Sequence, residues 1–291
     1  MDKIFKSVAI VGAGLVGGSL GLALRRRGLA GHVVGVGRRE SSLRQALSAG
    51  AVDEVTLDAA AGVSEADLVV LATPISAFGP IMPALAEGMK PGALLSDVAS
   101  TKQGVIRTIT RALKGRPDVV YIPTHPMAGS EKRGPESAVE GLFEGSVCIF
   151  TPLDGTPKEA LTALRKMWEA VGARVHIMDA AAHDRLVARI SHLPHLVAAA
   201  LMRVITPEEG AFAGGGLIDT SRVASGDPKL WRDICESNAP QIAAALKACA
   251  GALETLRGML EEGRFDELEE ALREAKLKRD GLIERRSTES Q

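Results

Sequence analysis

The sequence predicts a Rossmann-type α/β dinucleotide-binding domain followed by an all-α domain. Strand and helix patterns alternate over residues 1–178, which is typical of a parallel sheet. The first predicted strand runs straight into a G-x-G-x-x-G loop. Residues 179–291 show helical spacing without further strands. With 291 residues, 46% of them hydrophobic, the chain is long enough to bury two cores, and we place the domain boundary at Met178.

Composition excludes several classes of function. Lys and Arg number 35 against 36 Asp and Glu, so the formal net charge is −1 and no basic block predicts a nucleic-acid partner. Cys148, Cys235 and Cys249 are odd in number and form no C-x-x-C pair, which favours a reducing cytoplasm. No apolar stretch approaches the length that spans a bilayer. We therefore expect a cytoplasmic protein that binds neither nucleic acid nor membrane.

The glycine loop follows the predicted strand Ser7–Val11 and opens a helix. In such loops Gly12 allows a tight turn, Gly14 lets a pyrophosphate approach the backbone, and Gly17 lets helix and strand pack closely. The free N–H groups at the helix start then meet the phosphates, and we expect Leu15 and Val16 to lie there too. The alternative is a glycine-rich turn without a ligand.

The residues after the second predicted strand, His32–Val36, bear on the choice of dinucleotide. NAD-binding sites usually place an acidic residue there for the ribose hydroxyls, whereas arginine suits the 2′-phosphate of NADP. Here the chain has Arg38 and Arg39. We therefore favour NADP, while NAD stays open because Glu40 follows and both arginines could be solvated loop charges.

The alternation continues to Met178. One strand ends at Thr73 and Pro74, which we include among the cofactor contacts because they lie at the carboxyl end of the sheet. The remaining predicted strands are 93–97, 119–122, 146–151 and 174–178, and the predicted helices are 77–88, 102–114 and 157–171.

His125 follows the predicted strand Val119–Ile122 in what reads as a loop rich in Gly, Ser and Pro. Loops at the carboxyl ends of strands carry the chemistry of open α/β sheets, and an imidazole there could act as a general acid or base. The alternative is a surface turn. Ser100 lies at a neighbouring strand-to-helix junction, where it or Thr101 is expected to cap the helix that begins at Lys102.

The helical domain opens with a helix from Ala180 that Pro194 is expected to kink. His192 and His195 flank this proline. No third ligand lies near them at a suitable spacing, so we expect no metal. Core histidines and substrate contacts remain alternative readings.

A loop is expected over Thr206–Asp219, before a helix with Asp227 at its N-cap and Pro228 as its first residue. Arg232 would lie one turn into this helix, and its guanidinium suits a carboxylate. The alternative is a surface arginine paired with Asp233 or Glu236. Two further helices are expected, over 242–260 and from Phe265 onward.

These motifs together resemble the prephenate/arogenate dehydrogenases of tyrosine biosynthesis over nearly the whole chain. The glycine loop is generic to dinucleotide enzymes, whereas the His-Pro-Met-Ala-Gly and Ser-His-Leu-Pro-His stretches are specific together. The segments that carry the likeness are 12–19, 97–102, 125–131, 191–195 and 227–233.

The resemblance implies oxidative decarboxylation, with hydride transfer to NAD(P). It implies that His125 accepts the proton of the substrate hydroxyl and that Ser100 supports it. Arg232 would hold a substrate carboxylate, His195 would reach the substrate side chain, and the helical domain would form a homodimer. The remaining candidate substrate contacts are His192, Glu131 and Ser130.

Two departures and two rival readings accompany this resemblance. The acidic residue of NAD-preferring members is missing, and no regulatory or mutase domain flanks the predicted domains, so tyrosine feedback would act at the active site. A hydroxyacid or imino-acid reductase usually depends on a lysine in its helical domain, but none occurs between Met178 and Pro228. A non-catalytic dinucleotide sensor would bind NADP without turnover.

Overall fold

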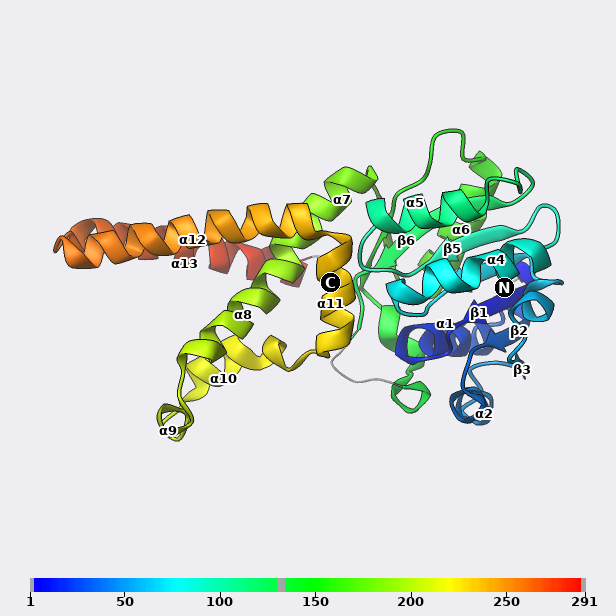
Figure 1. Ribbon diagram of the computed structural model, residues 1–291, viewed down its shortest axis with the longest axis horizontal. Coiled ribbons are helices and arrows are strands. Elements are labelled where there is room, and N and C mark those ends of the chain that lie inside the picture. The colour runs from blue at the N-terminus through cyan, green and yellow to red at the C-terminus, as the bar shows by residue number, and fades with distance from the viewer. Residues whose placement is uncertain (1–2, 130–133, 289–291) are drawn as a thin grey trace. The chain divides into compact units, whose positions relative to one another are not determined.

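The computed structural model describes residues 3–129 and 134–288, with side chains up to residue 284 (Figure 1). The chain divides into two compact units, Met1–Ala239 and Pro240–Gln291. No helix of the described part is long and apolar enough to cross a membrane.

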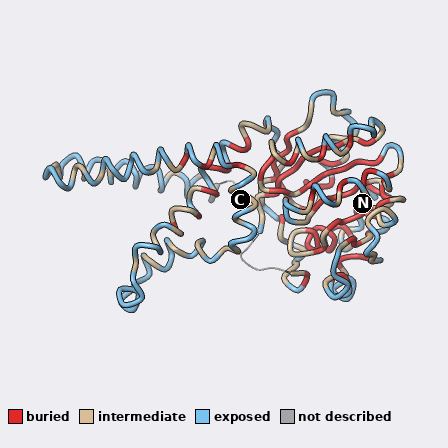
Figure 2. Tube along the Cα trace, in the orientation of Figure 1, coloured by how far each residue is buried: buried red, intermediate tan, exposed pale blue. Residues whose placement is uncertain are grey.

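The first unit is built on an eight-stranded sheet of order β3-β2-β1-β4-β5-β6-β7-β8. All neighbouring strands pair in parallel except β6 and β7. The strands are β1 Phe5–Val11, β2 Ala30–Val36, β3 Glu54–Thr56, β4 Leu68–Leu71, β5 Leu94–Asp97, β6 Val120–Pro126, β7 Val147–Phe150 and β8 Arg174–Ile177. Central strands such as β4 are buried throughout and uniformly apolar, as strands covered on both faces must be (Figure 2).

Helices cover both faces of this sheet and enclose two apolar cores. One core holds side chains of α1 and α6, including Leu20, Leu24 and Trp168. The other holds side chains of α4 and α5, including Phe78 and Ile109. The helices of this part of the chain are α1 Leu15–Arg26, α2 Glu40–Ser48, α3 Ala59–Val63, α4 Phe78–Gly88, α5 Gln103–Ala112 and α6 Lys158–Ala170, with the short 3-10 helices η1 Ile75–Ala77, η2 Pro135–Ser137 and η3 Glu140–Phe143.

The direction of chain winding reverses between β1 and β4, which are neighbours in the sheet. A parallel α/β sheet opens a crevice at such a point, outside the carboxyl ends of the strands. The glycine loop follows β1 at this edge. The fold therefore positions the loop where a dinucleotide binds in Rossmann-type sheets.

The expectation of a loop around His125 was wrong. Strand β6 continues to Pro126, because antiparallel β7 pairs with Thr124, His125 and Pro126 beyond the last β5 partner, Pro123. His125 therefore sits on a hydrogen-bonded strand, opposite Ile149, and its backbone is held more rigidly than a loop would hold it.

Helices also replace the loop expected over Thr206–Asp219. Thr206 and Glu209 form a reciprocal capping box that starts α9, Pro207–Gly210, and α10 follows at Gly215–Ser221. The remaining elements of this unit are α7 Ala180–Val187, η4 Ala188–His192, α8 Leu193–Val204, η5 Arg222–Ser225 and α11 Pro228–Ser237.

The helix expected from Ala180 contains a π-helical turn just before Pro194. The π-helical turn η4 interrupts the helical run, and α8 restarts at Leu193 with Pro194 in its first turn. The backbone N–H of Leu193, just before the proline, bonds to the Ala188 carbonyl five residues back, as in a π-helical turn.

The second unit consists of α12 Ala239–Glu261 and α13 Phe265–Thr288. Gly263 has φ +70°, which suits the sharp turn between them, and Arg264 pairs with Glu262 and Glu267 on either side. Several large apolar side chains of these helices are more than half exposed: Leu253, Leu260, Phe265, Leu272, Leu277 and Leu282. An exposed apolar surface of this kind is typical of a protein contact.

Candidate functional site

His125 lies at the end of β6 with 8% of its surface exposed. Its Nδ1 is 2.8 Å from Nε2 of His183, a fully buried residue of α7. The two rings meet edge to face, with centroids 5.0 Å apart. The structure thus brings the predicted base against a second imidazole that sequence patterns did not single out.

Asp184 holds His183 from the other side. Its Oδ1 is 2.8 Å from His183 Nδ1 and accepts a hydrogen bond of 2.7 Å from the backbone N–H of Lys102. Its Oδ2 accepts one of 2.9 Å from the backbone N–H of Gln103. Asp184 therefore caps α5, which corrects the expectation that Ser100 or Thr101 would do so.

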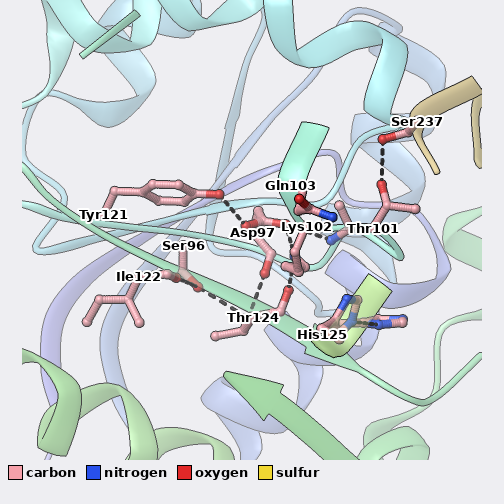
Figure 3. Close-up of polar contacts among 12 residues, drawn as sticks. Ser96, Asp97, Thr101, Lys102, Gln103, Tyr121, Ile122, Thr124, His125 and Ser237 are labelled. Atoms are coloured by element: carbon pink, nitrogen blue, oxygen red, sulfur yellow. Dashed lines mark hydrogen bonds and ion pairs between the residues drawn. The ribbon is translucent and has the colours of Figure 1, made fainter. Parts of the chain in front are cut away.

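A buried ion pair lies near His125, as Figure 3 shows. Lys102 Nζ is 2.6 Å from Asp97 Oδ1 and donates to the carbonyl of Thr124 at 2.5 Å, while neither charged side chain is exposed. Tyr121 donates its hydroxyl to Asp97 Oδ2 at 2.8 Å. The pair joins β5, β6 and the start of α5, and it contacts β6 at Thr124, next to the candidate base.

The electrostatic surroundings keep His125 neutral. Burial lowers its pKa well below the usual imidazole value, and the positive charges that His183, Lys102 and His192 can carry lower it further. Asp184 behaves in the opposite way. Burial alone would raise its pKa, but hydrogen bonds from His183 and from the backbone of Gln103 and Lys102 bring it below the usual value, so the carboxyl is ionised.

His192 and His195 form a second buried group with Trp231 of α11. The ring of His195 stacks on the indole with centroids 3.5 Å apart and planes 9° apart, and its Nδ1 has no hydrogen-bond partner among the described residues. Burial lowers the pKa of both histidines, that of His192 to about 4. Asn238 Nδ2 lies 3.4 Å from His192 Nδ1 and donates to the Asp184 carbonyl at 2.9 Å.

The orphaned Nδ1 of His195 is a buried polar atom, and such an atom costs free energy unless a ligand or water satisfies it. No group of three or more His, Cys, Asp or Glu side chains in the described part of the chain could hold a metal ion. A polar ligand group therefore suits the His195 position better than a metal.

Among the described residues, the other predicted site residues, Arg232 and Ser100, make no hydrogen bond or ion pair with His125. The side chain of Arg232 is 80% exposed and lies 4.0 Å from Glu236, the surface pairing that the sequence left open. Ser100 is partly buried and makes no side-chain hydrogen bond among the described residues. Ser130 and Glu131 lie outside the described residues.

The glycine loop fits a dinucleotide position by position. Gly12 has φ +101°, and a Cβ there would lie 2.8 Å from the Ala72 backbone. A Cβ on Gly17 would lie 2.2 Å from the Gly12 carbonyl, so the close packing of helix on strand requires glycine. Gly14, in contrast, has open space within 4 Å, and the Thr73 hydroxyl is buried without a partner in the described structure. Open space and an orphaned hydroxyl are what a bound dinucleotide would fill.

The residues after β2 are exposed. Arg38 and Arg39 lie on the surface between β2 and α2, where nothing in the described structure pairs them. The carboxylate of Glu40 is hydrogen-bonded to Arg44 one turn along α2, with the Arg44 Nε at 3.0 Å. Glu40 is therefore already engaged, whereas both guanidinium groups face solvent near the end of the strand.

Family models match most of the chain. Residues 20–177 match the prephenate dehydrogenase nucleotide-binding domain, and residues 179–274 match the prephenate dehydrogenase dimerization domain. The chain belongs to the prephenate dehydrogenase family. The α/β domain and the helical dimerisation domain predicted from the sequence are thereby confirmed.

Individual relatives agree with this family membership. Cyclohexadienyl dehydrogenase of Zymomonas mobilis is 33% identical over 94% of both chains. The prephenate dehydrogenase of A. aeolicus, solved with hydroxyphenyl propionate and NAD+, is 33% identical with a TM-score of 0.89, covering 95% of this chain and 98% of its own. Synechocystis arogenate dehydrogenase is 31% identical with a TM-score of 0.81, covering 95% and 99%.

Sequence patterns missed His183 and Asp184, and they placed Lys102 at a strand-to-helix junction without assigning it a role. A His-Asp pair at the start of a helix carries no motif of its own, and Lys102 reads as an ordinary first-turn residue. The contacts of His183 with His125 and of Asp184 with the start of α5 join segments about 60 to 80 positions apart, which no local pattern reveals. One available signal was that Asp97 and Lys102 flank a strand-to-helix junction, where buried charges pair.

Replacing Gly14 by Ala tests the cofactor site. Because the Cβ would enter open space, we expect an unchanged melting temperature and a dinucleotide dissociation constant raised at least about ten-fold, equal to about 1.4 kcal/mol. Gly115→Ala is the control, since its Cβ also meets nothing and Gly115 lies between α5 and β6. Titration calorimetry with both variants measures the difference, and equal affinities would remove Gly14 from the phosphate contact.

Proposed function

We propose that this chain catalyses the oxidative decarboxylation of prephenate or arogenate with NAD(P), giving 4-hydroxyphenylpyruvate or tyrosine in tyrosine biosynthesis. The observation that carries the proposal is the His125 site: a buried, neutral imidazole at the same edge of the sheet as a glycine loop with room for a dinucleotide. Membership of the prephenate dehydrogenase family supports it.

The proposed reaction needs a base that is neutral before the step. When bound, the nicotinamide would accept a hydride from the ring carbon that bears the hydroxyl. His125 would accept the hydroxyl proton as that oxygen gains carbonyl character. Loss of the ring carboxylate as carbon dioxide then makes the ring aromatic, and His125 would return its proton to the phenolic oxygen, so no net proton is consumed.

The other predicted site residues are proposed contacts of the same pocket. Ser100 would support His125, and the orphaned Nδ1 of His195 would meet a polar group of the substrate, with His192 behind it. Arg232 would offer its exposed guanidinium to a substrate carboxylate in a second subunit. Glu131 and Ser130 would lie at the pocket mouth.

We propose a homodimer formed by residues 179–291, with residues 1–178 as the dinucleotide domain. The match to a dimerization domain over residues 179–274 supports it. So do the exposed apolar side chains of α12 and α13 and those on α8 to α10, namely Met202, Val204, Phe212 and Ile218. The three unpaired cysteines favour a cytoplasmic setting.

NADP is the proposed preferred dinucleotide. Arg38 and Arg39 are exposed where the 2′-phosphate would lie, and Glu40 is occupied by Arg44. A relative's structure contains NAD+, so NAD stays the alternative.

Absorbance of the reduced nicotinamide tests the function directly. Purified protein is mixed with prephenate or arogenate and with NAD or NADP, and we expect turnover in at least one of the four mixtures. His125→Asn should bind the dinucleotide normally while turnover falls about 100-fold or more, as expected for loss of a general base. Silence of the wild type in all four mixtures, with dinucleotide bound, would instead favour a sensor or another reductase.

The pH profile tests the neutral state of His125. The charged and titratable groups that act on its ring are His183 of α7, Lys102 just before α5, and His192. Because these surroundings lower the pKa of His125, its base form persists as the pH falls. We expect kcat/KM to hold through pH 6 and to decline only well below the ordinary imidazole pKa of about 6.5. Circular dichroism at each pH separates this decline from unfolding, and an acidic limb at 6.5 or above would contradict the assignment.

Replacing Arg38 or Arg39 by Ala tests the dinucleotide preference. Loss of a charge-assisted phosphate contact should raise KM for NADP about ten-fold and leave KM for NAD nearly unchanged. Arg111→Ala, an exposed arginine of α5, is the matched charge control. Equal changes for both dinucleotides would return these arginines to the surface-charge reading.

A further inference from the structure

Three buried side chains form a continuous line of hydrogen bonds that ends at His125. Asp184 Oδ1 and His183 Nδ1 are 2.8 Å apart, and His183 Nε2 and His125 Nδ1 are also 2.8 Å apart. Asp184 and His183 are fully buried neighbours at the start of α7, so neither is placed to touch a substrate. In each of these two hydrogen bonds, one atom carries the proton and the other accepts it, so the donor of each bond has to be identified.

The Asp184 carboxylate determines which atom donates in its hydrogen bond with His183. Asp184 accepts backbone N–H groups on both oxygens, from Lys102 and Gln103 at the start of α5. These donors and the positive end of the α5 dipole keep the carboxyl ionised, so it can only accept. The proton between Asp184 and His183 therefore belongs to His183 Nδ1.

The donor in the hydrogen bond between His183 and His125 follows from this assignment. A neutral histidine that carries its proton on Nδ1 has a bare Nε2, which can only accept. His183 Nε2 then accepts the Nδ1–H of His125, which leaves the lone pair of His125 on Nε2. A doubly protonated His183 would reverse this bond and put the His125 proton on Nε2, where it would block acceptance of a further proton.

We propose that His183 and Asp184 are positioning residues that hold His125 in its Nδ1–H form, with Nε2 free to accept the proton of the substrate hydroxyl. The inference rests on the proposed role of His125 as base. It also gives Asp184 a dual role, because the same carboxylate caps α5 and orients the base. Because the N–H groups of α5 and His183 bond to the same carboxylate, a shift of α5 would also change the proton position on His125.

Asp184→Asn isolates the directional role. With its NH2 at the Oδ1 position, the amide donates to His183 Nδ1 and turns His183 to its Nε2–H form, while its oxygen at the Oδ2 position still accepts from the Gln103 N–H. His125 would then carry its proton on Nε2. We expect kcat to fall about 100-fold or more, as for loss of a general base, with a much smaller change in KM.

Substitutions of His183 keep the Asp184 cap of α5 and change only the hydrogen bonds between Asp184 and His125. Both His183→Gln and His183→Leu leave Asp184 bonded to the two N–H groups of α5. A glutamine can accept from His125 through its oxygen and donate to Asp184 through its nitrogen, whereas a leucine of similar size can do neither. Turnover should therefore rank wild type first, glutamine second and leucine last. Leucine equal to or better than glutamine would indicate a packing role and overturn the proposal.

Nitrogen NMR of 15N-histidine-labelled protein reads the proton positions without any turnover. The wild type should show His125 and His183 each protonated on Nδ1 and bare on Nε2, with His125→Asn and His183→Gln used for assignment. In Asp184→Asn both patterns should exchange. A wild-type His125 protonated on Nε2 or a doubly protonated wild-type His183 would each overturn the proposal.

Kinetics of a double variant separate orientation from stability. If Asp184 acts through His125, adding Asp184→Asn to His125→Asn should lower kcat less than about three-fold further, because the two residues act as one unit. Full additivity of the two losses would overturn the proposal.

Asp179→Asn is the matched control, since Asp179 caps the same helix through Ala182 but lies outside the hydrogen-bond line. Because asparagine caps a helix about as well as aspartate, this variant should leave the melting temperature nearly unchanged and kcat within about two-fold of the wild type. The NMR assignment also stands apart from the proposed function. A wild type with the expected proton positions but no turnover with any substrate would refute the function and support the tautomer inference.

Discussion

The carboxylate of Asp184 is the contact on which the candidate site depends. It is buried, and an isolated buried charge would cost several kcal/mol. Two backbone N–H groups and the dipole at the start of α5 offset this cost, and His183 supplies a third donor. Because α7 follows the last strand of the sheet and α5 lies within the α/β layers, one side chain joins the helical segment to the sheet and sets the direction of the hydrogen bonds to His125.

The ion pair of Lys102 and Asp97 plays a second part near the same residue. Both groups are fully buried, and Lys102 also holds the Thr124 carbonyl next to His125 in β6. A buried pair of this kind contributes little net stability, but loss of one partner leaves an uncompensated charge. Its effect on the site comes from its position. The Lys102 ammonium near the imidazole opposes protonation of His125, and its hydrogen bond to Thr124 holds the strand that carries His125.

The fold brings the glycine loop and His125 to the same edge of the sheet through strand order. The crevice between β1 and β4 lies beside the glycine loop, and β5 and β6 follow on the same side of it. Antiparallel β7 extends β6 past its parallel partner, so His125 projects from a paired strand. A base on a strand is positioned more accurately than one on a loop, which suits a reaction in which hydroxyl, hydride and carboxylate must align.

The sequence by itself determined the alternation of strands and helices and the glycine loop, and it predicted His125 as a site residue, because each rests on local periodicity or on a short motif that residues close in the chain define. Gly12 and Gly17 were readable for the same reason, since steric limits on a tight turn act over a few residues. Tertiary structure alone decided that β6 extends to Pro126 and that Asp184 caps α5. It also decided that His183 meets His125, and that Arg232 is exposed. These outcomes depend on contacts between distant segments, whose partners no local pattern can name.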